Sequence, residues 1–137
     1  MQFNTGRNNT KFRICTPIRN ILLKDEAVQS IVGDRIFPII APEGTKGAFI
    51  TYARSEYSVK KTNMQIYEHD CNVLLCCVSH SYDESQALAE AVFKSLEGLY
   101  KYKDDANGLI INGISLVDSY EDAVDDVYVQ MLMLKIW

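Results

Sequence analysis

Acidic side chains near the C-terminus are the first residues in this sequence that could do chemistry. Calcium and other hard cations collect carboxylate oxygens, so a cluster of acids could form a cation site. The spacing here differs from the twelve-residue calcium loop, which alternates its ligands around a central glycine and ends in glutamate. We therefore expect a solvated acidic loop whose carboxylates are Asp118, Glu121, Asp122, Asp125 and Asp126.

Imidazole and thiol groups on one predicted strand raise a second possibility, a zinc site. His69, Cys71 and Cys77 share one face of this strand because their spacing is even. At about 3.3 Å per residue, however, Cys71 and Cys77 lie roughly 20 Å apart, which is too far for two ligands of one ion. A nucleophilic pair of Cys77 and His80 also fails, since the thiol belongs to an apolar run and no third group is evident to orient the pair.

The cysteines are better explained as reduced core residues. Cys76 and Cys77 are adjacent in the predicted strand, so they point to opposite faces and are poorly placed for a disulfide. The sequence contains no glycine-rich phosphate loop, no HExxH and no GxSxG motif. We expect no enzymatic activity, no cofactor and no metal.

Length and charge narrow the classes further. A chain of 137 residues is the usual size of one domain. Its net charge of −4 argues against a free-standing nucleic-acid binder, which is held by phosphate neutralisation. No apolar run approaches the ~20 residues of a membrane span, and the start lacks a signal-peptide core, so we expect a protein made in a cytoplasm, with no membrane partner.

A long hairpin is the main predicted element. Ala48–Tyr52 begins one strand, and an apolar run inside Gln65–Ser79 predicts a second strand covered on both faces. Fifteen strand residues span roughly 50 Å, whereas a compact chain of this length is only about 37 Å across. Either a bulge shortens the hairpin or its tip projects as an arm, and the residues near that basic tip are Tyr57, Val59, Lys60 and Lys61.

The remaining segments complete an α+β fold. Thr16-Pro17 predicts a helix start, Asp25 a second cap, and Ser81 with Glu84 a capping box before a third helical stretch. Later strands are expected at Leu109–Val117, interrupted at Asn112-Gly113, and at Val127–Trp137. We expect residues 1–15 to form a flexible arm. Residues 16–137 should form one domain with an antiparallel or mixed sheet of about four to five strands, a long hairpin arm and two to three helices.

Two segments, read together, resemble a known family. Val32-Gly33-Asp34-Arg35-Ile36-Phe37-Pro38 and Phe49-Ile50-Thr51-Tyr52 resemble the opening of the tail-completion, or head-to-tail joining, proteins of long-tailed bacteriophages. The later order of long strand, Ser-Tyr-Asp-Glu helix, Asn-Gly-Ile strand and aromatic-ended final strand is also similar. The match runs from about Pro17 to Trp137, although the N-terminal arm is extra and the cysteine-rich strand is unusual.

The resemblance implies a structural virion protein, assembled in the bacterial host cytoplasm. It implies a ring at the head-proximal end of the tail, sixfold or, for an adaptor-like protein, twelvefold. Its partners would be the tail tube protein and the head connector or portal adaptor, with genomic DNA passing through the lumen. The family has no catalytic residues to transfer. A tail terminator and a head-side adaptor remain open alternatives.

The residues themselves add a hypothesis about assembly. A basic arm ending at Lys60 and Lys61 and an acidic loop at Asp118–Asp126 are opposite in charge, so the arm of one subunit could lie on the acidic loop of its neighbour. Tyr57 and Val59 beside the two lysines are then also interface residues. In a competing interpretation, the basic residues face the lumen of the portal–tail channel and contact passing DNA. A small metal-binding or enzymatic domain is the third class.

Overall fold

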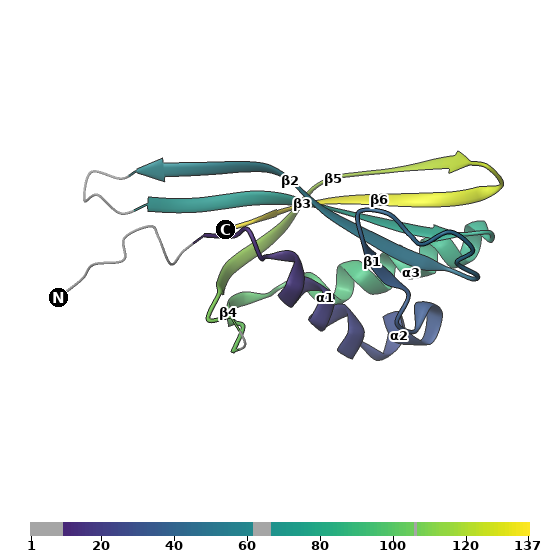
Figure 1. Cartoon of the computed structure of the whole chain (residues 1–137), viewed down its shortest axis with the longest axis horizontal. Helices are drawn as coiled ribbons and strands as arrows, with labels where there is room; N and C mark the ends of the chain where they lie inside the picture. Colours follow the sequence, from purple (N-terminus) through teal and green to yellow (C-terminus); the bar gives the residue numbers. More distant parts are fainter. Residues whose placement is uncertain (1–9, 62–66, 106) are drawn as a thin grey trace.

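A computed structural model describes residues 10–61, 67–105 and 107–137 of the chain (Figure 1). Within these ranges the helices and strands follow one another in this order: α1 Cys15–Lys24, α2 Glu26–Val32, β1 Ile36–Pro38, β2 Phe49–Lys61, β3 Tyr67–Ser79, α3 Tyr82–Leu96, β4 Tyr100–Lys103, β5 Ile110–Val124 and β6 Val127–Ile136. None of the described helices is long and apolar enough to cross a membrane.

The described strands form one mixed sheet in the order β1-β2-β3-β6-β5-β4. Only the short edge strand β1 runs parallel to its neighbour, and the other pairs are antiparallel. The α+β class is confirmed, but the sheet has six strands where four to five were expected. The difference comes partly from β4, four polar residues predicted as a connection, which pair with the start of β5.

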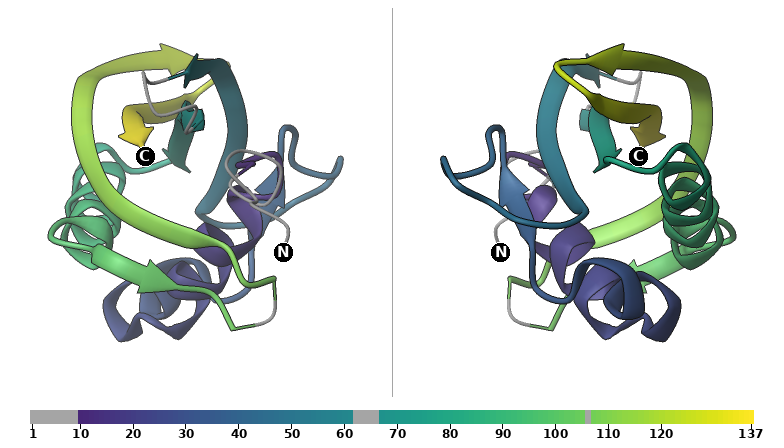
Figure 2. Two further views of the ribbon diagram at one scale, coloured as in Figure 1. Left: turned by 90° about the vertical axis from the view of Figure 1, so that its left-hand side faces the viewer. Right: turned by 90° about the vertical axis from the view of Figure 1, so that its right-hand side faces the viewer.

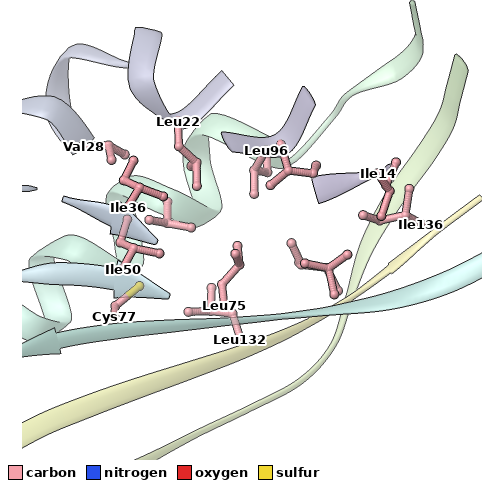
Figure 3. Close-up of a cluster of buried hydrophobic side chains, with 14 of the residues drawn as sticks. Ile14, Leu22, Val28, Ile36, Ile50, Leu75, Cys77, Leu96, Leu132 and Ile136 are labelled. Atoms are coloured by element: carbon pink, nitrogen blue, oxygen red, sulfur yellow. The ribbon is translucent and has the colours of Figure 1, made fainter. Parts of the chain in front are cut away.

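The helices pack together against one face of a strongly curled sheet (Figures 1 and 2). The core between them is built from side chains of every layer, among them Leu22, Ile50, Leu75 and Ile136, all fully buried (Figure 3). On β3 the buried residues alternate, because Val73, Leu75 and Cys77 face the helices while Leu74 and Cys76 remain half-buried. The prediction that both faces are covered is therefore wrong for this part of β3, since the described helices lie on one face only.

Two of the three predicted helix caps form as expected. The Asp25 carboxylate accepts a hydrogen bond from the Val28 N–H at 3.0 Å, and the Ser81 hydroxyl accepts one from the Glu84 N–H at 3.2 Å. The Glu84 carboxylate does not reach back to Ser81 but accepts from the Ser79 hydroxyl at 2.7 Å. Thr16 is not a cap, because α1 already begins at Cys15 and has no side-chain cap.

The predicted flexible arm ends earlier than residue 15. Its first nine residues lie outside the described ranges, but Lys11 is buried and Ile14 is fully buried in the core. Residues 10–14 show no helical or strand periodicity, so their packing could not be predicted from the sequence. Packing onto the domain therefore begins at Lys11 or earlier, at least five residues before the predicted domain start at residue 16.

Candidate assembly interface

The β2–β3 hairpin extends past the helical layer, as Figure 1 shows. Its strands pair antiparallel, with Val59 opposite His69 and Lys60 opposite Glu68, and the register shifts between Arg54 and Tyr57. A bulge and a projecting tip were the two alternatives predicted from the length of the hairpin. The structure has both an irregular register and a projecting end. Val59, Lys60 and Lys61 are exposed at the end of the described part of β2.

The arm is less basic than the sequence suggested. Besides Lys60 and Lys61, its described part carries three exposed or half-buried acids on the two strands, Glu56, Glu68 and Asp70. Cross-strand neighbours of opposite charge attract one another, so Glu68 offsets the charge of Lys60. Any electrostatic contact of this arm with a partner therefore depends on the positions of both its positive and its negative side chains.

Tyr57 joins the arm to the N-terminal segment. Its hydroxyl accepts a hydrogen bond from the Lys11 N–H at 2.6 Å and lies 3.0 Å from His69 Nδ1. The Phe12 ring stacks on the Tyr57 ring at 4.7 Å, and the Arg54 guanidinium lies over both rings at 4.9 and 5.2 Å. Tyr57, a predicted interface residue, is half-buried, and these contacts within the chain fix the base of the arm.

The predicted acidic loop is a second hairpin. Asp118, Glu121 and Asp122 lie on β5 and pair residue by residue with β6, with Glu121 opposite Gln130 and Asp122 opposite Val129. The loop was predicted because acidic residues are rare in strands, and this prediction was wrong. Here the apolar strand β6 pairs with the exposed, acidic part of β5 and holds it in register. The segment from residue 117 to residue 134 contains no Lys or Arg, so this hairpin has one sign of charge.

The end of the acidic hairpin is a two-residue turn. Asp125 and Asp126 adopt positive φ angles of 48° and 66°, the combination required by the type I′ turn that suits the twist of a hairpin. The carbonyl of Asp126 is also contacted by His80 Nδ1 at 3.3 Å. Both carboxylates are exposed, which leaves two adjacent negative charges at the outermost point of the hairpin.

Glu121 is the best-held acid of this surface. It accepts hydrogen bonds from the Tyr82 hydroxyl at 3.0 Å and from Gln130 Nε2 at 2.8 Å. The hydrogen bond to Glu121 raises the pKa of Tyr82, since it stabilises the protonated phenol. Tyr82, Glu121 and Tyr128 line a shallow hollow of about 260 Å³, so the acidic hairpin carries aromatic as well as charged contact surface.

The other chemical candidates are not brought together. Cys77 is wholly buried, and burial raises the pKa of its thiol, while His80 contacts the turn of the acidic hairpin. All four cysteines are free, as predicted. Within the part of the chain that the structure describes, no group of three or more His, Cys, Asp or Glu side chains could hold a metal ion.

Two apolar features were missed by reasoning from the sequence. Ile39 and Ile40, for which no prediction was made, are exposed in the segment between β1 and β2. An apolar pocket of about 400 Å³ lies between the end of α3 and β5. The exposed isoleucines could have been noticed from the sequence, because they lie between two prolines in the run Pro38-Ile39-Ile40-Ala41-Pro42. Apolar residues in such a run cannot join a regular helix.

Comparison with known proteins finds the same fold in a viral-type particle. A chain described as "Virion of native gene transfer agent (GTA) particle" superposes with a TM-score of 0.67, covering 87% of this chain and 89% of that one. The two sequences are 14% identical, so the likeness shows a shared fold. No protein-family model and no curated protein matches the sequence.

Proposed function

We propose that this protein is a structural subunit of a tailed bacteriophage or a phage-like particle. The observation that carries the proposal is the shared fold with a chain of a gene transfer agent virion, which extends over 87% of this sequence. The order of motifs that resembles tail-completion proteins supports the same class independently. In this role the chain acts through binding surfaces and performs no catalysis.

Within the particle we place the protein in a ring at the head-proximal end of the tail. It completes the tail there and joins it to the head connector. Its neighbours are then other copies of itself, in a sixfold or twelvefold ring, the tail tube protein, and the connector or portal adaptor. The lumen of such a ring passes the genomic DNA.

The two hairpins supply surfaces for contacts between copies. Their ends point in opposite directions along the longest axis of the molecule (Figure 1). The β2–β3 hairpin of one copy can therefore meet the β5–β6 hairpin of the next copy. A contact between two different surfaces is heterologous, and it closes into a ring when the rotation permits. We propose that Lys60 and Lys61 lie on the neighbour's acidic hairpin, where opposite charges set register and association rate more than affinity.

Charge reversal at the arm tests this role. Lys60→Glu with Lys61→Glu should reduce assembly of the protein into rings and particles, measured by electron microscopy of particles complemented with the variant. The matched control is Lys101→Glu with Lys103→Glu on β4, where both side chains are exposed and the same charge change should leave assembly intact. Normal particles with the first variant would remove the proposed arm contact.

The same variants separate the competing role in DNA contact. If Lys60 and Lys61 face passing DNA, their reversal should leave particles intact but slow DNA ejection in a salt-dependent way, since phosphate contacts weaken with salt. If purified particles contain no copy of this protein, the structural role itself fails. These outcomes differ, so one set of particle preparations distinguishes them.

A further inference from the structure

Two neighbouring isoleucines stand out on the surface. Ile39 and Ile40 are 76% and 77% exposed, which is more than any other large apolar side chain in the described ranges. We call these two residues the isoleucine knob. Adjacent large apolar side chains that both remain in water are candidates for a contact site, because burying them against a partner is favourable.

The backbone of the knob is strained. Ile39 has a φ of 66°, a region that β-branched residues rarely adopt because the side chain collides with its own backbone. It is held there by hydrogen bonds from the Ile39 N–H to the Tyr52 carbonyl at 2.7 Å and from the Ile40 N–H to the Pro38 carbonyl at 2.6 Å. Strain that the surrounding structure maintains is concentrated at functional sites, so the conformation itself indicates that the display of these side chains is used.

An apolar pocket on the same molecule fits such a knob. It has a volume of about 400 Å³ and lies between the last turns of α3 and the middle of β5. Phe93, Leu96 and Leu116 supply apolar walls, and the Glu97 side chain stands at its edge. The knob loop carries the exposed Lys46, which is opposite in charge to Glu97.

The knob and the pocket face opposite ways. Both views of Figure 2 show the loop between β1 and β2 on one side of the molecule, with α3 and β5 on the other. A protrusion on one side and a complementary pocket on the other produce a heterologous contact between copies. The hairpin ends, in contrast, point along the long axis, so a knob contact is separate from the arm contact.

We propose that the isoleucine knob of one copy inserts into the α3–β5 pocket of a second copy. This inference rests on the proposed assembly of copies and names a surface that holds them side by side. The two isoleucines bury apolar area that water otherwise covers, and Lys46 and Glu97 orient the approach. The contact does not depend on the charges of either hairpin.

Photo-crosslinking of the full-length chain tests the contact directly. The crosslinking residue p-benzoylphenylalanine replaces Ile40, the purified protein is irradiated up to its solubility limit, and mass spectrometry identifies the joined peptides. We expect crosslinks between copies to reach residues 93–97 or 114–116. Crosslinks confined to other surfaces, or none at any concentration, would overturn the proposal.

A matched pair of substitutions makes the test specific. Leu116→Lys places a long, charged side chain at the pocket and should lower the crosslink yield at least about tenfold, because the lysine occupies the apolar volume and its ammonium loses water when the knob enters. The control Val117→Lys adds the same charge at the next residue, which is 51% exposed and outside the pocket, and should leave the yield unchanged. Equal yields for the two variants would refute insertion into the pocket.

Mixing two deficient variants gives a second readout. A knob variant, Ile39→Asn with Ile40→Ser, places a residue that tolerates positive φ at position 39 and should lose the knob contact between copies. The knob variant still has an intact pocket, and the Leu116→Lys variant still has an intact knob. A mixture of the two can therefore form a single knob contact, and sedimentation experiments should show one-to-one dimers that do not grow further through this contact. Absence of the crosslink in particles that do contain the protein would overturn this contact alone, whereas a crosslink without incorporation into particles would overturn only the proposed function.

Discussion

The turn of the acidic hairpin has an aspartate where glycine is preferred, and replacing the turn residues should make the protein more stable but less able to assemble. Asp125 and Asp126 both have positive φ, where a type I′ turn prefers Asn-Gly or Asp-Gly, so Asp126 is the poorly fitting residue. The left-handed region costs residues with a Cβ about 1–2 kcal/mol, and Asp lies at the low end because its side chain can hydrogen-bond locally. Asp125→Asn with Asp126→Gly relieves this strain and also removes two adjacent like charges.

The size of the effect can be worked out. Glycine reduces this stabilisation, because its conformational freedom favours the unfolded chain by about 0.5–1 kcal/mol. We therefore expect a net stabilisation of the folded state of roughly 0.5–1 kcal/mol. At about 2.1 cal/mol/K per residue, the 137 residues give an unfolding entropy near 0.29 kcal/mol/K. The melting temperature should therefore rise by about 2–3 °C.

Thermal unfolding by circular dichroism, at low and high salt, measures this rise. Salt screens the repulsion between the two carboxylates but not the backbone strain, so the gain should shrink at high salt without vanishing. Asp105→Asn, an exposed charge removal away from the turn, should leave the melting temperature nearly unchanged. A lower melting temperature for the double variant would show that the aspartates stabilise the turn, and normal ring assembly would show that their charges are not used there.

Three further changes test other parts of the structure. Tyr57→Phe leaves the Lys11 N–H without its partner, so we expect a loss of about 1–3 kcal/mol and faster hydrogen exchange at the Lys11 amide; unchanged exchange would contradict the anchoring role. Gly113→Ala places a Cβ 2.5 Å from Cζ2 of Trp137, the single tryptophan, so the ring must move, with a lower melting temperature and a shifted fluorescence maximum; an identical spectrum would refute this. Burial raises the pKa of Cys71 from 9.0 to about 11, so the folded state keeps the thiol protonated while the unfolded chain ionises. Stability in urea titrations should fall between these two pH values and fall less in Cys71→Ala.

Local signals in the sequence predicted the elements that they directly build. Asp25 and Ser81 were identified as caps because a side-chain oxygen beside a free backbone N–H acts within one turn. The apolar run of β3 predicted a long central strand for a similar reason. The first half of β5 was predicted as a strand, but its acidic second half, residues 118–124, could not be found in this way. Acidic residues are poor strand formers, and their order comes from pairing with β6, which their own sequence does not encode.

Contacts between distant residues were also beyond the reach of sequence reasoning. The Lys11 N–H meets the Tyr57 hydroxyl across 46 residues of chain, and no periodic pattern in residues 10–14 points to that partner. The consequence for the candidate site is specific. Lys60 and Lys61 were expected near the end of a hairpin arm, and they lie at the end of the described part of β2. The acids were expected in a loop but lie on a second hairpin. Tyr57, expected near the tip, holds the arm to the N-terminal segment.

The places where local rules are broken coincide with the proposed contact surfaces. Ile39 adopts a φ that suits glycine, and Asp126 occupies a turn position that favours glycine. Each feature lowers the stability of a single copy, and such departures are expected where a sequence is shaped by function. If the assembled ring is the functional state, contacts made only there offset these costs. Substitutions that stabilise the isolated chain at these positions should therefore weaken its assembly, and the turn and knob variants measure both effects in the same protein.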